Sequence, residues 1–176
     1  MTELSQTKKQ FILHWGEMGN RWGINRTVAQ IHALLHVSPT PLTAEEIAET
    51  LSVARSNVST SLRELQGWGL VRAVHVLGDR RQHFDSIKDV WEMFKIILEQ
   101  RKRREVDPTL DLLKSCIAEL GPNDKYTRER LRELYEFFAE IDALYTEMRG
   151  VPIPALRGAI RARGKFRKLF IGQVRS

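Results

Sequence analysis

A segment in the first third of the chain constrains the fold more than any other feature. Thr43 and Glu46 have the spacing of a capping box, in which each side chain accepts from the backbone N–H of the other residue. The helix that starts there runs only to Leu51, because residues 52–54 (Ser-Val-Ala) predict a tight break. A second helix follows from Arg55 and stops at the glycines of residues 67–69. Two short helices joined by such a turn are typical of a helix-turn-helix.

The residues after this motif change from helical periodicity to a strand pattern. Residues 70–77 are rich in β-formers, residues 78–80 have turn chemistry, and residues 82–84 can return as a partner strand. The sequence therefore predicts a two-stranded β-wing, and we expect it to be the only sheet.

The rest of the chain reads as helix, with apolar residues three or four apart. One long helix is expected from a cap at Ser86 to Arg104, with a break at Asp107 and Pro108. Further on, apolar residues recur in steps of three and four, which indicates a seam that faces another helix. Its members are Leu131, Leu134, Phe138, Ile141, Tyr145 and Met148.

These patterns predict a mainly α fold: a winged helix-turn-helix with a two-stranded wing, plus long helices that form a dimerisation region. We divide the chain into N-terminal helices at 1–38, a DNA-binding lobe at 39–86, dimerisation helices at 87–150 and a basic helix or tail at 151–176.

Charge is distributed as a patchwork. The net charge is +6, and residues 52–104 hold eleven basic against six acidic residues, whereas residues 105–150 hold six against eleven. The single cysteine excludes an internal disulfide. We expect a soluble cytoplasmic protein without membrane contact, since no apolar run approaches a membrane span and the N-terminus lacks a signal-peptide layout. No enzyme motif is present, so we expect no catalysis.

The second helix of the motif has one apolar and one polar face. With Val58, Leu62 and Leu65 turned inward, the opposite side presents short hydrogen-bonding side chains and one arginine. Small polar residues allow a helix to approach the major-groove floor, where arginine pairs with guanine and asparagine with adenine. A merely solvated face is the alternative interpretation. The candidate contact residues are Ser56, Asn57, Ser59, Thr60 and Arg63.

The tip of the predicted wing carries two adjacent arginines, Arg80 and Arg81. Arginines at the end of a hairpin can enter a minor groove. Asp79 is expected to pair with Arg81 and to fix its direction. The capped lead helix, the tight turn and this basic hairpin together favour DNA binding over a solvated surface.

Several strings of residues together resemble the GbsR branch of the MarR transcriptional regulators: 22–26 (WGINR), 39–51, 54–59 (ARSNVS), 78–81 (GDRR) and 101–108. The resemblance covers roughly residues 10–150. It implies a winged-helix homodimer that binds double-stranded operator DNA and usually represses transcription. Carried over by position, it implies that Arg55, Ser56, Asn57, Ser59, Thr60 and Arg63 belong to the reading helix and that Arg80 and Arg81 belong to the wing.

The resemblance also raises the question of an effector, since MarR-type regulators commonly bind one between their lobes and some relatives in this branch respond to choline-like cations. Aromatic rings attract such cations through their negative faces. Ordinary core and dimer packing is the simpler interpretation of the same rings. The residues concerned are Trp91, Phe94, Tyr135, Phe138 and Tyr145.

His32 and His36 are four residues apart, a spacing that can chelate a metal, but no carboxylate or cysteine accompanies them. We therefore expect no metal and no cofactor. The rival to a homodimeric regulator acting on a palindromic operator is a winged-helix module that binds a protein instead of DNA.

Overall fold

The structure is a computed structural model of the 176-residue chain, and it describes residues 4–158 and residue 162. The chain forms two compact units, Met1–Ile97 and Leu98–Ser176. The finer division into four parts that the sequence indicates stays a prediction.

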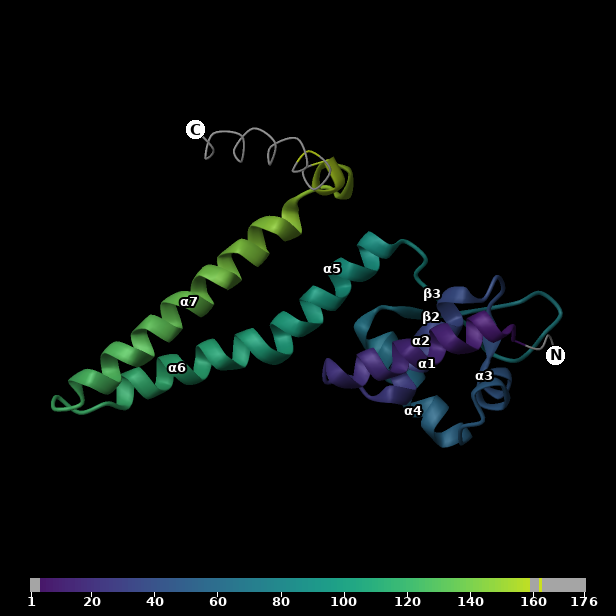
Figure 1. The fold of residues 1–176 in the computed structure, drawn as a ribbon, viewed down its shortest axis with the longest axis horizontal. Helices are drawn as coiled ribbons and strands as arrows, with labels where there is room; N and C mark the ends of the chain where they lie inside the picture. Colours follow the sequence, from purple (N-terminus) through teal and green to yellow (C-terminus); the bar gives the residue numbers. More distant parts are fainter. Residues whose placement is uncertain (1–3, 159–161, 163–176) are drawn as a thin grey trace, which may run out of the picture. The chain divides into compact units, whose positions relative to one another are not determined.

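From residue 4 onward, the first unit contains four helices, three short strands and the start of a fifth helix (Figure 1). In order these are α1 (Gln6–Arg21), α2 (Arg26–Val37), β1 (Leu42–Thr43), α3 (Ala44–Leu51), α4 (Arg55–Trp68), β2 (Val71–Val74), β3 (His83–Ser86) and α5 (Val90–Arg101). The mainly helical, winged-helix fold class that the sequence predicts is confirmed.

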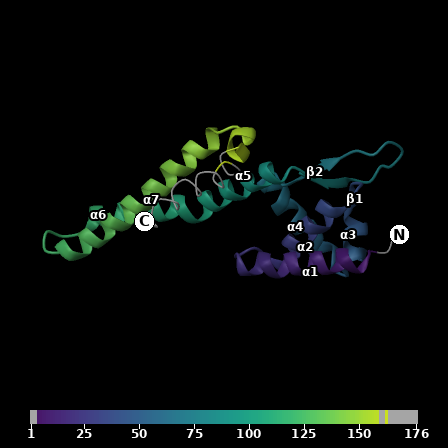
Figure 2. The same ribbon diagram turned by 45° about the horizontal axis from the view of Figure 1, so that its top comes forward.

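The core of this unit is aliphatic and is centred on α2. Ile31 of α2, Ile47 of α3 and Val58 of α4 are each fully buried. The helix α1 lies alongside α2 in both Figure 1 and Figure 2. Gly19 allows this close approach, because a Cβ placed there would lie 2.5 Å from the Cβ of Ala29. Burial of these side chains fixes α4 against α2 and leaves its other face outside.

The boundaries of the helix-turn-helix follow the residues that the sequence singles out. Both hydrogen bonds of the capping box at Thr43 and Glu46 are present. Ser52 ends α3 in the left-handed conformation with a φ of 53°, and Gly69 ends α4 with a φ of 80°. A left-handed residue stops a helix because its backbone cannot continue the ladder of hydrogen bonds.

The sheet has three strands in the order β1-β3-β2, all antiparallel. The expectation of two strands was therefore wrong by one. The third, β1, has two residues, with Leu42 opposite Phe84 and Thr43 opposite His83. A strand of this length has no alternation to detect in a sequence. It forms because the extended residue that caps α3 also pairs with β3.

The start of α5 also differs from the expectation. Ser86 belongs to β3 and is buried, so it caps no helix. The cap is Asp89, whose carboxylate accepts from the backbone N–H of Trp91 at 2.8 Å and of Glu92 at 3.0 Å. A carboxylate at this position satisfies two of the backbone donors that a helix start leaves unpaired.

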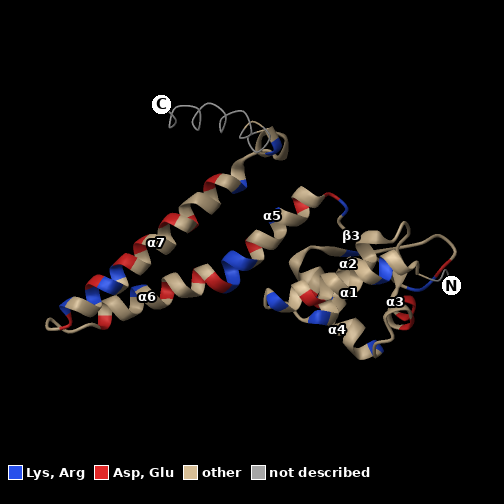
Figure 3. Cartoon of the chain, in the orientation of Figure 1, with Lys and Arg blue, Asp and Glu red and all other residues tan. Residues whose placement is uncertain are grey.

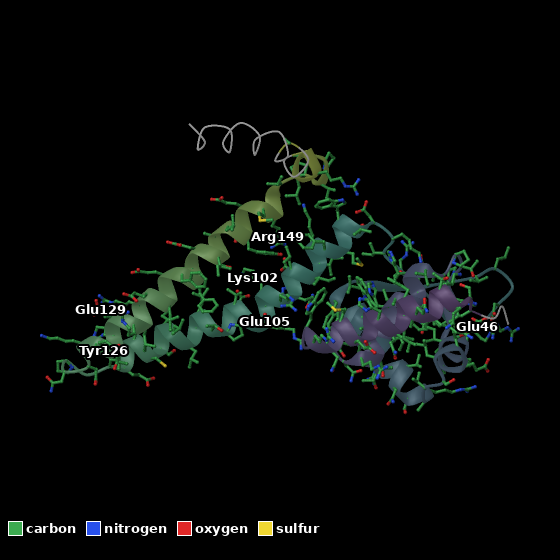
Figure 4. All side chains as sticks on the ribbon, in the orientation of Figure 1. Glu46, Lys102, Glu105, Tyr126, Glu129 and Arg149 are labelled. Carbon is green, nitrogen blue, oxygen red and sulfur yellow. The ribbon has the colours of Figure 1, made fainter. Side chains whose placement is uncertain are left out.

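The second unit begins at Leu98 and shows no break at Pro108. The last turn of α5 passes into a π-helical segment, η1 (Lys102–Val106), and then into α6 (Asp107–Glu119). Pro108 lies in the first turn of α6, directly after η1, and the π-helical segment is where the regular ladder of hydrogen bonds is already altered. Lys102 ties this bulge to α6 and to α7 (Lys125–Gly150), with ion pairs of 2.6 Å to Asp107 and 2.8 Å to Asp142 (Figure 4).

The helices α6 and α7 form an antiparallel hairpin, seen in Figures 1 and 2. Arg128 fixes its turn by donating to the carbonyl oxygens of Ile117 at 3.0 Å and Leu120 at 2.7 Å. A cation suits this place because the last carbonyls of a helix carry negative partial charge.

The seam expected on α7 is split between two faces. Leu131, Phe138, Tyr145 and Met148 are half-buried, whereas Leu134 and Ile141 are exposed. A second apolar stripe on α7, which we call the outer stripe, consists of Leu134, Phe137, Ile141 and Leu144. The sequence pattern predicts a single seam because the two apolar stripes of α7 are adjacent and are offset from each other by one residue.

No helix among the described residues is both long and apolar enough to cross a bilayer. The basic tail predicted from residue 151 onward lies largely outside the described residues.

Candidate nucleic-acid interface

The two faces of α4 differ as the sequence predicts. Val58, Leu62 and Leu65 are at most 2 % exposed and belong to the core. All of the predicted contact residues on α4 lie on the exposed side: Arg55, Ser56, Asn57, Ser59, Thr60 and Arg63. The structure thus brings the polar set together on one surface of a rigid helix.

Both arginines of this set have partners within the chain. Arg63 donates to the Thr60 hydroxyl at 3.4 Å, and Arg55 lies 3.8 Å from the carboxylate of Glu45. Exposed contacts of this kind contribute little to stability. Both arginines therefore remain able to exchange these partners for a ligand.

The N-terminus of α4 lacks a side-chain cap. Ala54 stands at the capping position and supplies no oxygen for the first backbone N–H groups. Those donors carry the positive end of the helix dipole, which attracts a phosphate. The uncapped start and the polar face occupy the same part of the surface.

In the loop between β2 and β3, several hydrogen bonds join Asp79 and Arg81. The Asp79 carboxylate accepts from the backbone N–H of Arg81 at 2.9 Å and from its Nε at 3.0 Å. The turn before it requires Gly78, whose φ of +86° is disfavoured for other residues. These bonds with Arg81 hold the pKa of Asp79 well below its usual range. The ion pair expected here is present, and it fixes the direction of Arg81.

His83 anchors the same loop and was missed as a supporting residue. It is 7 % exposed, its Nδ1 lies 3.1 Å from the Arg81 carbonyl oxygen, and its Nε2 lies 3.6 Å from the Asp79 carboxylate. His83 lies in β3 opposite Val74, and its burial there allows it to support the loop. The spacing of Asp79, Arg81 and His83 at every second residue hints at a shared side, but the burial of His83 depends on the register of β3, which the sequence does not show.

Arg80 differs from its neighbour. It is exposed and makes no hydrogen bond or ion pair with any other residue in the described part of the chain. The wing thus presents two adjacent arginines, of which Arg81 is bound to Asp79 and Arg80 has no such contact among the described residues.

Charge around the interface is uneven (Figure 3). Acidic side chains gather on α3, where Glu45 and Glu46 lie in the first turn. The backbone hydrogen bond from Thr43 lowers the pKa of Glu46, so this carboxylate remains charged. A polyanion would therefore meet α4 and the wing favourably and the start of α3 unfavourably.

The residues predicted as an effector pocket belong to both units. In the first unit, the rings of Trp91 and Phe94 meet edge-to-face at 6.5 Å. In the second, Tyr145 donates to the Glu99 carboxylate at 2.6 Å, while Tyr135 and Phe138 are half-buried on α7. Burial together with this bond raises the pKa of Tyr145 to about 12. A choline-like ligand held by all five stays a prediction.

Comparison with known proteins agrees with this geometry. Residues 22–82, which include the helix-turn-helix and most of the wing, match the profile of the MarR family. The match to the MarR family is thus confined to about a third of the chain. Over a longer stretch, the chain is 21 % identical across 146 residues to the putative HTH-type transcriptional regulator YvaV of Bacillus subtilis, covering 78 % of this chain and 82 % of that protein.

It is also 23 % identical over 117 residues to the HTH-type transcriptional repressor GbsR of Bacillus subtilis, covering 66 % of this chain and 64 % of the relative. The resemblance to the GbsR branch is thereby confirmed. Among solved structures, a transcriptional regulator with 24 % sequence identity superposes with a TM-score of 0.66 and covers 82 % of this chain and 96 % of that one. That likeness shows that the fold is shared.

Proposed function

We propose that this protein is a sequence-specific DNA-binding transcriptional regulator, most simply a repressor, that acts as a homodimer on a palindromic operator. The single observation that carries the proposal is the exposed polar face of α4 beside a wing whose Arg81 is held by Asp79. The relatives described as regulators and the match to the MarR family support the same class of function.

In this proposal α4 lies in the major groove. Asn57 and Arg63 read base edges, because their side chains form paired hydrogen bonds with adenine and guanine. The short side chains of Ser56 and Ser59 let the helix backbone approach the groove. The uncapped N-terminus of α4 takes a phosphate and sets the register of the helix on the duplex.

The wing contributes affinity more than base selection. Arg80 and Arg81 contact the minor groove and its phosphates, where width and charge matter more than individual bases. Arg81 arrives already oriented by Asp79, so less side-chain freedom is lost on binding.

The outer stripe of α7 supports a homodimer. Leu134, Phe137, Ile141 and Leu144 are between 36 % and 58 % exposed and follow one another in steps of three, four and three. This order is the same in both directions, so an antiparallel second copy would set Leu134 against the partner's Leu144 and Phe137 against the partner's Ile141. Such a self-complementary contact is what a two-fold dimer requires.

The charges of α7 change along its length. Residues 125–132 include four basic and one acidic residue, whereas residues 133–148 include five acidic residues and no basic one. Figure 3 shows the basic start of α7 and the acidic stretch after it. In the antiparallel register of the outer stripe, Arg130 and Arg132 come close to the partner's Glu147, whereas Glu136 lies level with the partner's Asp142. The apolar order of the outer stripe, and not charge, therefore carries the orientation.

Selection of bound genomic fragments by the purified protein, followed by binding measurements at increasing salt, tests the proposal. We expect recovery of a palindromic site whose affinity falls steeply with salt, through counterion release. Recovery of no enriched sequence, with only weak binding to any duplex, would favour the rival module that binds a protein.

A further inference from the structure

The tip of the wing is a tight turn with an apolar residue at its corner. The backbone N–H of Asp79 donates to the carbonyl oxygen of Val76 at 3.1 Å, which closes a four-residue turn. Gly78 holds the third position with a φ of +86°, close to the value of a type II turn, so Leu77 holds the second position. In Figure 2 the loop between β2 and β3 extends away from the helices of the first unit.

Leu77 is fully exposed at this corner. Its exposed fraction is 104 %, and that of Val76 beside it is 39 %. An isolated exposed leucine is common on protein surfaces, but a turn ordinarily selects glycine and short polar residues. Because its side chain faces solvent, Leu77 adds no burial to this fold. The feature that distinguishes it is therefore its setting.

Two arginines follow directly behind this apolar tip, and the turn fixes one of them. Asp79 closes the turn through its backbone N–H and holds the Nε of Arg81 through its carboxylate at 3.0 Å. Leu77 and the guanidinium of Arg81 thus keep a defined spatial relation, and Arg80 stands exposed between Asp79 and Arg81. A partner that satisfies all of them must offer an apolar interior bordered by negative charge.

The minor groove of DNA and an anionic bilayer both have this chemistry. Binding of a bilayer grows with the buried apolar area, and two side chains on a turn supply little of it. The Asp79 carboxylate beside the tip would also approach the negative surface of the bilayer. A minor groove has phosphates at its walls and stacked bases at its floor, and a single apolar side chain can enter between two base pairs. The observations therefore favour DNA.

We propose that Leu77 is a wedge that enters the minor groove between two base pairs, partly unstacks them and bends the duplex, while Arg80 and Arg81 contact the groove walls. This inference rests on the proposed DNA-binding function and deepens it. Leu77 is then a specificity-determining residue, although it forms no hydrogen bond with a base.

Sequence selection by a wedge follows from the cost of unstacking. Pyrimidine–purine steps (TA and CA/TG) are the most easily kinked and unstacked, so they take a wedge at the lowest cost. Burial of the leucine side chain offsets part of that cost. The operator should therefore contain such a step at the place where each wing meets the minor groove.

Bending of the operator duplex recovered by fragment selection tests the wedge. Energy transfer between dyes at the duplex ends measures the bend. Leu77→Ala should reduce the bend by about half or more and weaken operator binding about fivefold, whereas Leu77→Met should retain both. Leu112→Ala is the matched control, because this leucine is 64 % exposed on α6, and it should change neither quantity. These leucines are exposed, so the variants should fold normally.

A second measurement locates the unstacked step. The fluorescence of 2-aminopurine rises when the base loses its stacking partner, so this base is placed in turn at each step of the operator. We expect a rise at one step in each half-site with wild type and Leu77→Met, and none with Leu77→Ala. Leu77→Asn, which has nearly the same size but is polar, should behave as Leu77→Ala.

Three outcomes would overturn the proposal, and they differ in what else they affect. A duplex that is bound tightly and stays straight, or that Leu77→Ala bends as wild type does, would refute the wedge and leave the regulatory function standing. Binding to no duplex at all would refute both. Binding to phosphatidylglycerol vesicles that is lost in Leu77→Ala, with equal DNA bending by both proteins, would assign the turn to a membrane instead.

Discussion

Asp79 restricts the directions in which the Arg81 guanidinium can point. Its carboxylate accepts from both the backbone N–H and Nε of that residue, and so joins the side chain to the turn of the wing. A substitution at Asp79 therefore separates two properties of Arg81. It removes the orientation and leaves the positive charge.

We expect Asp79→Ala to lower the ratio of operator affinity to non-specific affinity several-fold, while non-specific binding stays equal or rises because a negative charge is lost. Fluorescence anisotropy with an operator duplex and a scrambled duplex measures both. Asp111→Ala removes the same charge from the exposed surface of α6 and should leave the ratio intact. An unchanged ratio in Asp79→Ala would show that orientation of Arg81 is irrelevant.

His32 links the stability of the first unit to pH. Burial, with smaller effects of His36 and Lys88, lowers its pKa to about 4 in the folded state, against 6.5 for an ordinary histidine. Between these values the unfolded chain binds the additional proton. The contribution to stability is therefore complete above the unfolded pKa and declines as the pH falls through the folded pKa.

We expect His32 to remove about 1–3 kcal/mol of unfolding free energy between pH 7 and pH 4.5. Urea denaturation of wild type and His32→Leu at both pH values isolates this effect, since the variant lacks the group. The two proteins should lose different amounts of stability over this interval, and equal losses would contradict the prediction.

At the scale of helices, we expect a glycine-to-alanine substitution to change stability in opposite directions at two positions. A Cβ at Gly19 would lie 2.5 Å from the Cβ of Ala29, so Gly19→Ala should separate α1 from α2 and cost about 1–3 kcal/mol. Gly67 in α4 has nothing within 4 Å of such a Cβ, so Gly67→Ala should stabilise by about 0.5–1 kcal/mol. Chemical denaturation measures both, and effects of equal sign would refute the packing argument.

The outer stripe of α7 is the predicted interface of the homodimer. Phe137→Lys with Ile141→Lys would place four charges in a paired dimer interface, and sedimentation should then show a monomer. Tyr126→Lys is the matched control, because this residue is 74 % exposed on the same helix but outside the stripe (Figure 4). A dimer that survives the double substitution would move the interface elsewhere.

The relative direction of the two α7 helices in the dimer is tested separately, by introducing cysteines into a Cys116→Ser background. Leu134→Cys together with Leu144→Cys should cross-link two copies in an antiparallel pair, whereas Leu134→Cys alone should not. Efficient cross-linking by Leu134→Cys alone would indicate a parallel pair, in which each residue meets its own copy.

The elements that the sequence predicts correctly are those with a local chemical cause. The capping box at Thr43, the glycine stop of α4 and the inward set around Val58 all depend on neighbours within one or two turns. The elements missed depend on distant partners. The strand β1 exists through pairing with β3, and helix continuity at Pro108 depends on the η1 segment that Lys102 fastens to α6 and α7.

The same distinction holds for the candidate interface. Polar residues of α4 and the pair of Asp79 with Arg81 could be predicted, because helical and turn spacing place them. The anchoring role of His83 could not, because it requires the register of β3.

At the scale of the whole molecule, the proposed reading of DNA and the proposed pairing of two copies belong to different units. The first unit contains α4 and the wing, and α7 of the second unit contains the outer stripe. A two-fold dimer built in this way would present two reading helices to half-sites about 34–36 Å apart on one face of the duplex. Palindromic operators would follow from protein symmetry.

In the proposed complex, α4 reads bases while the wing binds the backbone. The most direct measurement is the affinity of wild type, Asn57→Ala, Arg63→Ala and Arg80→Ala for the selected operator and for a scrambled duplex, across a series of salt concentrations. We expect the first two variants to lose about 1–3 kcal/mol on the operator alone, and Arg80→Ala to weaken both duplexes and flatten the salt dependence. Asn57→Ala and Arg63→Ala proteins that bind the operator as tightly and as selectively as wild type would contradict the claim.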